Sequence, residues 1–256
     1  MARVLITGSA DGLGLMAARL LAGEGHAVTL HARSDARAAQ ARAALPAAEH
    51  TVAGDLSSIE GTRQVADQAN ALGRYDAVIH NAGVGPREPG RIETADGLSH
   101  VFAINVLAPY LLTALITPPD RFVFLSSGTH RDGRADFSDL QWAHRAWVSW
   151  QAYADSKLFD VVLCFAVARR WPDVLSNAVE PGWVPTKMGG PGAPDDISLG
   201  PVTQAWLATS DDPAAMVSGQ YLYHQRLRET NPATRSHAVQ EQLLEACAKL
   251  TGVELP

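Results

Sequence analysis

The sequence predicts an α/β fold in which a doubly wound parallel β-sheet of about seven strands carries helices on both faces. Short apolar runs of strand length alternate with longer segments of helical periodicity through the first two thirds of the chain. With 256 residues, 46% of them hydrophobic and 19% charged, the chain is long enough to bury one large core. Since no repeat, low-complexity tract or clear linker divides the sequence, we expect a single domain over residues 1–256.

Seven short segments have the length, composition and flanking turn residues of strands. In chain order the expected strands are Arg3–Thr7, Ala27–His31, His50–Ala53, Ala77–His80, Arg121–Leu125, Leu175–Glu180 and Tyr221–His224. The segments between and after them have the apolar spacing of helices. The expected helices are Leu13–Ala22, Asp35–Ala44, Ile59–Leu72, Ala95–Leu115, Trp150–Trp171, Pro201–Ala208 and Ala233–Leu250. This alternation predicts βαβ units with parallel strands.

Two segments interrupt the alternation and are long for connections in a compact domain. Residues 128–152 have no sustained period and carry Phe137 and three tryptophans, and residues 183–200 are rich in Gly and Pro. Long loops often carry function, so we expect the aromatic part, residues 137–150, and the 183–200 loop to form a substrate pocket and its lid. The alternative is surface filling without a function.

Charge and composition exclude several classes of protein. The formal net charge of −6 argues against a nucleic-acid or anionic-membrane partner. No uncharged apolar run reaches the roughly 18 residues that a membrane span needs, and the first expected strand leaves no room for a signal peptide. Cys164 and Cys247 fall in apolar helical patterns and are expected to be reduced. The histidines and cysteines lack the spacing of metal ligands, so no metal site is expected. Reduced cysteines without a signal peptide or a membrane span predict a cytoplasmic protein.

The turn after the first expected strand reads Thr7-Gly8-Ser9-Ala10-Asp11-Gly12-Leu13-Gly14 and opens the first helix. Glycines in such a turn let the backbone approach a pyrophosphate, which then lies at the positive end of the helix. The setting predicts a Rossmann-like dinucleotide site, and the alternative is a plain strand-to-helix turn.

Arg33 follows the second expected strand, where a dinucleotide-binding sheet meets the adenosine ribose. An acidic residue there would favour a free 2′-hydroxyl, whereas a guanidinium suits a 2′-phosphate. NADP(H) is therefore the favoured cofactor. Asp11 could oppose the phosphate, so NAD(H) remains possible.

Two further strand ends carry residues suited to the adenosine half of a cofactor. Asp55-Leu56 follows the third strand, where the carboxylate could accept from an adenine amino group or cap the next helix. Asn81-Ala82-Gly83 follows the fourth strand, and its small residues leave room for the cofactor.

Tyr153 and Lys157 lie four residues apart at the start of a long helical pattern. At that spacing the two side chains share one face of a helix. An ammonium beside a phenol favours the phenolate form, which makes the tyrosine a better proton carrier at neutral pH. The alternative is a half-buried tyrosine beside a solvated lysine.

Together these elements resemble the short-chain dehydrogenase/reductase family, over roughly residues 3–225. The matching pattern is Thr7-Gly8-x-x-x-Gly12-x-Gly14, Asp55-Leu56, Asn81-Ala82-Gly83, Asn105, Ser126-Ser127, Tyr153-x-x-x-Lys157 and Pro181-Gly182-x-x-x-Thr186. The glycine spacing resembles the single-domain branch. The residues Ser126-Ser127-x-x-His130, Asp139-Leu140-Gln141 and Tyr153-x-x-Ser156-Lys157-Leu158 are similar to the retinol-dehydrogenase-like subgroup.

The resemblance implies four catalytic positions. Tyr153 would exchange the proton with the substrate oxygen, and Lys157 would hold the phenol in its reactive state and bind the nicotinamide ribose. Ser127 would hydrogen-bond the substrate oxygen, and Asn105 would anchor a water that links Lys157 to solvent. The implied cofactor contacts are Thr7, Gly8, Ser9, Asp11, Gly12, Leu13, Gly14, Arg33, Asp55, Leu56, Asn81, Ala82, Gly83, Tyr153, Lys157, Pro181, Gly182, Val184 and Thr186.

The sequence departs from the family in two places. The interval between Ser127 and Tyr153 is longer by about a dozen residues than in the shortest members. Glu180 stands before Pro181-Gly182, where the retinol-like subgroup usually has His; a charge tuning cofactor affinity and a solvent-facing strand end are the two interpretations.

The function expected from the resemblance is NADP(H)-dependent reduction of a ketone or aldehyde of an apolar small molecule, or oxidation of the matching alcohol. The alternatives are an NAD-dependent secondary-alcohol dehydrogenase of the same family and a catalytically silent dinucleotide-sensing regulator, which would not need the proton donor. Relatives often associate through the helices that carry Asn105 and Tyr153, so a homodimer or homotetramer is possible.

Overall fold

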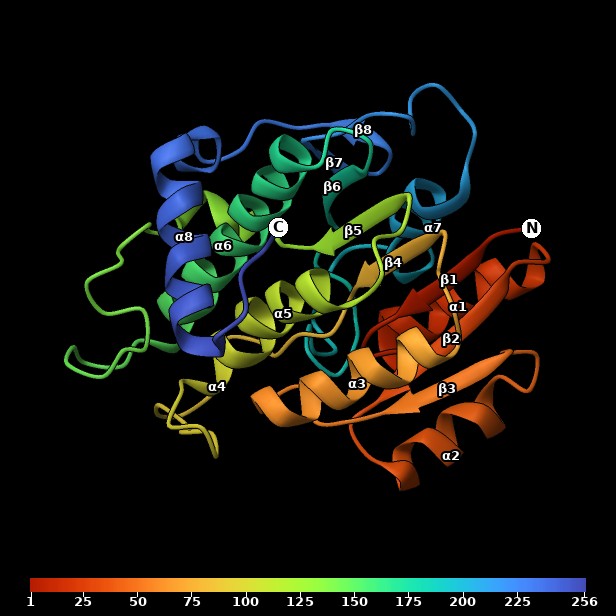
Figure 1. The fold of residues 1–256 in the computed structure, drawn as a ribbon, viewed down its shortest axis with the longest axis horizontal. Coiled ribbons are helices and arrows are strands. Elements are labelled where there is room, and N and C mark those ends of the chain that lie inside the picture. The colour runs from red at the N-terminus through yellow and green to blue at the C-terminus, as the bar shows by residue number, and fades with distance from the viewer.

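A computed structural model describes the whole chain, residues 1–256, and contains one eight-stranded sheet in the order β3-β2-β1-β4-β5-β6-β7-β8 (Figure 1). The strands are β1 (Arg3–Ile6), β2 (Ala27–Ala32), β3 (His50–Ala53), β4 (Ala77–His80), β5 (Arg121–Leu125), β6 (Leu175–Glu180), β7 (Gln220–Tyr223) and β8 (Arg226–Leu227). Strands β1 to β7 pair in parallel, which confirms the predicted doubly wound sheet. The strand order reverses between β1 and β4, so the loops after these strands diverge and open a crevice at their carboxyl ends.

The eighth strand is the one element of the sheet that we did not predict. β8 pairs antiparallel with β7 through a tight hairpin. Its two turn residues, His224 and Gln225, have φ of +48° and +61°. Turns of this type usually carry Asn-Gly or Asp-Gly, so the sequence lacks the signal that predicts them.

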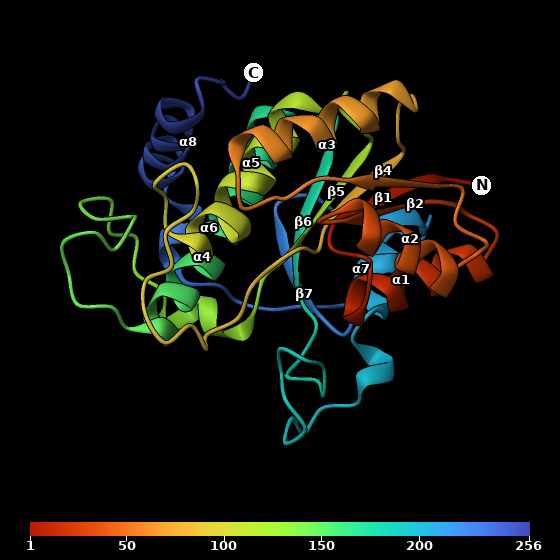
Figure 2. The same cartoon turned by 90° about the horizontal axis from the view of Figure 1, so that it is seen from below.

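Helices cover both faces of the sheet. They are α1 (Gly12–Gly23), α2 (Asp35–Ala44), α3 (Ile59–Ala71), α4 (His100–Phe102), α5 (Ala108–Leu115), α6 (Ser149–Arg170), α7 (Val202–Thr209) and α8 (His237–Thr251). One apolar core lies between the sheet and α3, α5, α6 and α8, and a second lies between the opposite face and α1, α2 and α7 (Figure 2). Within β1, Leu5 belongs to the first core and Val4 and Ile6 to the second, as the alternation of strand side chains requires.

The helix predicted over residues 95–115 differs from the observed one in its start and its geometry. Gly97, with φ of +77°, closes a turn between Glu93 and Ser99, so helical structure begins only at His100. Residues Ala103–Leu107 form a π-helical turn that contains Asn105. Single π turns inside helices often mark functional sites. The last helix begins at His237, after a 3₁₀ turn over Pro232–Arg235, rather than at Ala233.

The C-terminal helix α8 packs against α5 and α6, which belong to the two helical regions that we considered as possible contacts between copies of the chain (Figure 1). Tyr110 of α5 donates to Val253 O (2.7 Å), and Arg170 of α6 donates to Leu255 O (2.9 Å). The C-terminal segment therefore covers part of that face.

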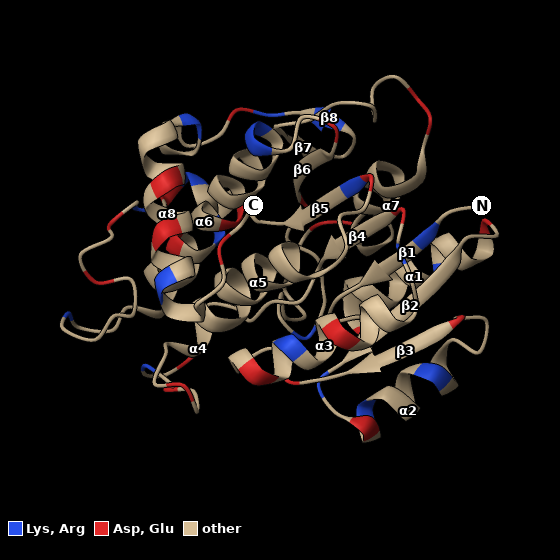
Figure 3. Cartoon of the chain, in the orientation of Figure 1, with Lys and Arg blue, Asp and Glu red and all other residues tan.

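Charged residues lie mainly on the outer faces of the helices and in the connecting loops (Figure 3). Cys164 and Cys247 are buried and unpaired. No helix combines the length and the apolar character that crossing a membrane requires.

Candidate active site

A cavity of about 1070 Å³ opens at the carboxyl edge of the sheet. Its walls come from the loops that follow β1 to β6 and from the start of α6. The predicted residues that line it are Gly8, Asp11, Gly12, Leu13, Arg33, Asp55, Leu56, Asn81, Ala82, Gly83, Tyr153, Lys157, Pro181 and Thr186. Residues from seven separate segments thus converge on one space, as a dinucleotide site at a switch point requires.

The glycine turn after β1 leaves no room for a side chain at Gly8 or Gly14. Gly8 has φ of +63°, and a Cβ there would lie 2.8 Å from Ala82 Cα. A Cβ on Gly14 would collide with Asn81 Nδ2 and lie 2.9 Å from Ser9 Cα. The backbone of the turn is thereby packed against the loop after β4 while its outer side faces the cavity, so the turn fits a pyrophosphate.

His31 holds this turn from behind. Its Nδ1 accepts from Gly8 N (2.9 Å), and its Nε2 lies 3.0 Å from Gly54 O, which assigns the proton to Nε2. Burial lowers the pKa of His31 to about 4, so the ring is neutral at physiological pH. His31 fixes the turn in shape, and it borders the cavity.

Thr7 and Ser9, two predicted cofactor contacts, lie behind the cavity wall. The Thr7 hydroxyl accepts from the amides of Asn81 and Ala82 (both 3.0 Å). The Ser9 hydroxyl donates to Ile6 O (2.8 Å) and accepts from His31 N (2.9 Å). Both side chains are buried and tie the strands together. Gly14, Gly182 and Val184 are also absent from the lining.

Cationic side chains gather where the loops after β1 and β2 border the cavity. Arg33 lines it and makes no ion pair or hydrogen bond, and Arg37, which sequence reasoning missed, lies beside it on α2. Arg37 binds Asp11 at 2.8 Å, and Lys187 of the 183–200 loop binds the same carboxylate oxygen at 2.7 Å. The hydrogen bond from Lys187 is the main cause that lowers the pKa of Asp11. The carboxylate that could oppose a phosphate is therefore paired with two cations.

Asp55 does not cap the next helix, the local role that we considered beside adenine binding. Its Oδ1 accepts from Ser57 N (2.9 Å) in a turn ahead of α3, whose cap is Ser58. The side chain still borders the cavity together with Leu56 and Ser57.

Asn105 lies under the cavity and joins two of its walls. Its Oδ1 accepts from Val84 N (2.8 Å), and its Nδ2 donates to Val84 O (3.1 Å) and to Ser156 Oγ (2.9 Å). The side chain is fully buried and its hydrogen bonds are made within the protein. A Cβ on Gly83 would lie 3.4 Å from Asn105 Oδ1 and 3.5 Å from Lys157 Nζ, so a glycine keeps this wall thin.

Tyr153 and Lys157 lie on one face of α6 and both border the cavity. The Lys157 ammonium is 5.9 Å from the centre of the Tyr153 ring and donates to Leu125 O (2.7 Å) and to Asp160 Oδ2 (2.7 Å). Burial disfavours the charge of Lys157, but Asp160 and Tyr153 outweigh it and raise the pKa of the lysine. The lysine is therefore held as an ammonium. Sequence reasoning missed Asp160, whose only signal is its spacing of three residues from Lys157.

The two serines after β5 have different environments. Ser126 borders the cavity, but its buried hydroxyl donates to Lys157 O (2.7 Å) and ties β5 to α6. Ser127 is half-buried, and its hydroxyl accepts from Thr129 N (3.3 Å) at the start of the 3₁₀ turn Gly128–Asp132. Ser127 itself is not among the lining residues, whereas its neighbours Leu125 and Ser126 are.

Glu180 faces the interior beside this turn, not solvent. Its Oε2 accepts from the Tyr221 hydroxyl (2.9 Å), its Oε1 lies 3.7 Å from Arg131, and a Cβ on Gly128 would lie 2.6 Å from Oε2. The carboxylate thus packs against the backbone next to Ser127. Because Tyr221 comes from β7, no local sequence pattern could have indicated this contact.

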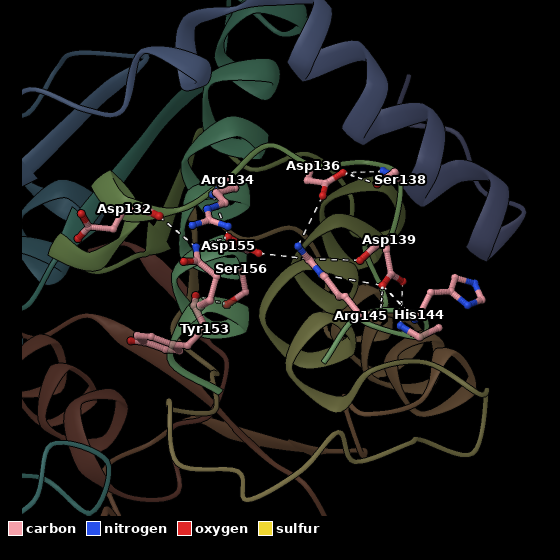
Figure 4. A network of polar contacts seen from close by, with 12 residues as sticks. Asp132, Arg134, Asp136, Ser138, Asp139, His144, Arg145, Tyr153, Asp155 and Ser156 are labelled. Atoms are coloured by element: carbon pink, nitrogen blue, oxygen red, sulfur yellow. Dashed lines mark hydrogen bonds and ion pairs between the residues drawn. The ribbon is translucent and has the colours of Figure 1, made fainter. Parts of the chain in front are cut away.

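The aromatic segment 137–150 does not cap the cavity, contrary to our expectation, since none of its residues lines the cavity. Asp139 instead folds the segment back by accepting from the amides of Ala143, His144 and Arg145 (2.8–3.1 Å) (Figure 4). The Arg145 guanidinium lies 3.6 Å from the centre of the Trp142 ring and binds Asp155 of α6.

Through Trp147 the segment contacts one of the residues that line the cavity, since the Trp147 Nε1 donates to Glu88 O (3.1 Å). Glu88 and His100, which pair at 2.6 Å, line the cavity in its place.

The 183–200 loop does contribute a wall, and Figure 2 shows it extending beyond the edge of the sheet. Its lining residues are Pro185, Thr186, Lys187, Met188 and Ile197. Trp183 closes the loop by donating from its amide to Asp195 Oδ2 (2.6 Å) and from Nε1 to Gly189 O (3.0 Å). Lys187 then connects the loop to the glycine turn through Asp11.

Comparison with known proteins agrees with this architecture. The sequence model for short chain dehydrogenases matches residues 2–196. The short-chain dehydrogenase chyC of Penicillium rubens is 39% identical over 261 aligned residues, which cover 100% of both chains. Retinol dehydrogenase 13 of Homo sapiens is 30% identical and covers 99% of this chain and 85% of its own length, which confirms the retinol-dehydrogenase-like resemblance.

A crystal structure of an uncharacterized protein from Mycobacterium paratuberculosis has the same fold, with a TM-score of 0.86 at 25% identity over 100% of this chain and 95% of that one. The likeness therefore extends over the sequence and the fold. The chain belongs to the short-chain dehydrogenase/reductase family of oxidoreductases.

Proposed function

We propose that this oxidoreductase uses NADP(H) to reduce a ketone or aldehyde of a small molecule, or to oxidise the matching alcohol. The observation that carries the proposal is the position of Tyr153 and Lys157 on the wall of the cavity that also contains the glycine turn. Tyr153 as proton donor and the Lys157 cation thus border the same cavity as the proposed pyrophosphate site. They lie on the other side of the switch point between β1 and β4 from Arg33.

The residues of the cavity fit a dinucleotide. Gly8 and Gly12 expose backbone at the N-terminus of α1, and Gly83 keeps the wall beside Lys157 thin enough for a ribose. Arg33 would bind the 2′-phosphate, Asp55 and Leu56 would border the adenine, and Lys157 would bind the nicotinamide ribose. Pro181 and Thr186 would bind near the nicotinamide. When bound, the cofactor supplies the hydride.

The protein's part of the reaction is to orient the carbonyl and to supply a proton to its oxygen. Ser127 would donate a hydrogen bond to that oxygen, and Tyr153 would transfer its phenolic proton to it as the alkoxide develops. The Lys157 ammonium would stabilise the phenolate left on Tyr153. The apolar side chains of Val84, Ile104, Pro185 and Met188 would contact the apolar body of the substrate and exclude water.

The preference for NADP(H) rests on Arg33 and on the pairing of Asp11. The Arg33 guanidinium is free of protein partners, and Arg37 and Lys187 neutralise the nearby carboxylate. An NAD-dependent alcohol dehydrogenase would use the same four catalytic residues, so the cofactor measurement separates the two activities. A silent dinucleotide sensor would bind the cofactor without turnover.

The test incubates purified protein with NADPH or NADH and a panel of ketones and aldehydes while cofactor absorbance is followed. We expect turnover with NADPH and its loss, by about a thousandfold, in Tyr153→Phe. The phenylalanine keeps the ring and removes only the hydroxyl. Equal turnover in this variant and in the unchanged protein would refute the mechanism, and cofactor binding without turnover would indicate the sensor. Sedimentation of the same preparation measures whether copies associate as a dimer or tetramer.

A further inference from the structure

The ammonium of Lys157 is one half of a buried ion pair. Its partner, Asp160, lies one turn further along α6, with Nζ 2.7 Å from Oδ2 and the two side chains only 6% and 4% exposed. Removing two charges from water is unfavourable unless they are paired and hydrogen-bonded to one another, and removing one partner leaves an uncompensated charge. The family resemblance assigns a role to Lys157 and none to Asp160.

The protein uses two of the three hydrogens of the ammonium. One is donated to Leu125 O on β5 and one to Asp160 Oδ2, both at 2.7 Å. A lysine has three donors and no acceptor. Since Lys157 borders the cavity, one donor is left for a ligand there. The two fixed bonds hold the nitrogen between the end of the sheet and the helix, so the free hydrogen has a set direction.

Asp160 also supplies the charge that balances the lysine. Lys157 is the cation that pairs with the Asp160 carboxylate. Burial raises the pKa of Asp160 to about 6, and the ammonium offsets part of that rise, so the carboxylate is ionised at neutral and alkaline pH. Burial lowers the pKa of Lys157, and Asp160 raises it. The net result is a raised pKa for Lys157.

Other titratable groups lie around the pair, on α6 and on the elements near it. On α6 itself these are Tyr153 and Cys164, and the elements packed against α6 add His100, His130, Arg131, Glu180, Tyr221, Arg235 and Cys247. Burial lowers the pKa of His130 to about 4 and raises those of Cys164, Cys247 and Tyr221 above their usual ranges.

The charged side chains among these groups have partners of their own. His100 pairs with Glu88, Arg131 with Glu180, and Arg235 lies over the Phe165 ring. Lys157 and Tyr153 therefore remain as the groups whose ionisation Asp160 can control.

We propose that Asp160 is a positioning residue for the proposed reduction: its carboxylate keeps Lys157 charged and directed at the cavity, and so sets the alkaline limit of activity. The inference rests on the proposed function, because it assigns Asp160 to the same proton-transfer site. In reduction, activity needs a protonated Tyr153 and a charged Lys157. Without the carboxylate, Lys157 loses its proton at lower pH, and any lysine that stays charged promotes ionisation of the phenol. Both effects end activity at lower pH.

The variant that tests this is Asp160→Asn, which keeps the size and one acceptor but removes the charge. We expect the alkaline limb of its kcat/KM profile for reduction to move to lower pH by about one to three units. Asp155→Asn is the matched control. Asp155 is also a buried carboxylate on α6, but it binds Arg145, Gln151 and the amide of Arg134 and does not contact Lys157. The alkaline limb of Asp155→Asn should lie at the same pH as that of the unchanged protein, even if the variant is less stable.

A second readout needs no substrate. The affinity for NADPH is measured by fluorescence across the same pH range. As pH rises, this affinity should begin to weaken at a lower pH in Asp160→Asn than in the unchanged protein. If Asp160→Asn does not fold, Asp160→Ser should show the same shift of the alkaline limb to lower pH. Asp160→Glu keeps the charge, so its alkaline limb should lie close to that of the unchanged protein. Coincident profiles for Asp160→Asn and the unchanged protein would overturn the inference, as would an equal shift in Asp155→Asn. If the unchanged protein shows no turnover, or Tyr153→Phe retains it, the proposed function fails instead.

Discussion

Lys187 binds Asp11 across the mouth of the cavity, with Nζ 2.7 Å from Oδ2, although the two residues are 176 positions apart in the sequence. The contact connects the 183–200 loop to the turn that fits a pyrophosphate. Lys187 is 84% exposed, so the pair contributes little to folding stability, about 0–1 kcal/mol. Its consequence lies in the charge of the site, since it pairs a carboxylate of the turn that we propose binds the pyrophosphate.

Lys187→Ala should therefore weaken NADPH binding several-fold and leave the Tm nearly unchanged. The variant leaves Asp11 with one cation instead of two, and the freed negative charge repels the cofactor phosphates. The effect should shrink at high salt because the pair is exposed. Titration of NADPH fluorescence at two salt concentrations measures it. Lys249→Ala, which removes an exposed lysine of α8, is the control and should bind NADPH as the unchanged protein does.

Arg33→Asp should weaken NADPH binding by about 10- to 100-fold and NADH binding far less, because it replaces a charge-assisted phosphate contact by a repulsion. Arg19→Asp makes the same charge change on α1, outside the cavity, and controls for net charge. Binding constants for both cofactors give the comparison. An equal loss of NADPH and NADH affinity in Arg33→Asp would sink the assignment of this residue to the 2′-phosphate.

Gly8 in the turn before α1 and Gly23 at the end of α1 should respond to alanine with opposite changes in stability. Gly8→Ala places a side chain at φ of +63° and 2.8 Å from Ala82 Cα, so we expect a loss of about 1–3 kcal/mol in folding free energy together with cofactor affinity. Gly23→Ala meets no atom within 4 Å and should stabilise the helix by about 0.5–1 kcal/mol. Denaturant unfolding measures both. A neutral Gly8→Ala would show that the turn can relax.

Tyr221→Phe should destabilise the protein by about 1–3 kcal/mol, because it removes the hydroxyl that donates to the Glu180 carboxylate, whose side chain is only 12% exposed. It should also lower kcat, since Glu180 packs against Gly128 beside Ser127. Tyr223→Phe removes a hydroxyl that has no hydrogen-bond partner in the protein and should change neither quantity. If Tyr221→Phe lowers stability but leaves kcat intact, Glu180 does not position the serine turn.

His80 should make folding stability depend on pH. Burial lowers its pKa to about 3, whereas an unfolded histidine titrates near pH ~6.5. The unfolded chain therefore takes up a proton below about pH 6.5 that the folded protein excludes, and the stability falls as pH drops. The loss is at most about 1.4 kcal/mol per pH unit for this ring.

The measurement for His80 compares unfolding free energies of the unchanged protein and His80→Phe from pH 7 to 5. Subtraction cancels other groups, including Asp160, whose raised pKa acts in the opposite direction. The slope should be shallower in the variant. Parallel slopes would contradict a neutral, buried His80.

Local patterns predicted the sheet well because each strand is an apolar run bounded by turn residues. Residues His50–Ala53, Ala77–His80 and Leu175–Glu180 form strands over the predicted bounds. The Tyr153 and Lys157 spacing placed both side chains on the cavity for the same reason, since i and i+4 share a helix face.

The contacts that sequence reasoning missed join distant segments. Arg37 and Lys187 meet at Asp11, and Glu180 meets Tyr221 of β7, without any local pattern that marks them. The prediction that residues 137–150 form part of the substrate pocket is wrong. Aromatic composition indicates that a segment is buried, but it does not indicate against which part of the protein the segment packs. Asp139 and Arg145 decide that by folding the segment onto α6.

The central claim is that Tyr153 transfers the proton in an NADPH-dependent reduction, and single-turnover oxidation of NADPH by a carbonyl substrate tests it most directly. The account predicts rapid loss of NADPH absorbance with the unchanged protein and a rate about a thousandfold lower in Tyr153→Phe, with NADPH affinity nearly the same. An unchanged rate in Tyr153→Phe, with the cofactor bound equally well, would contradict it.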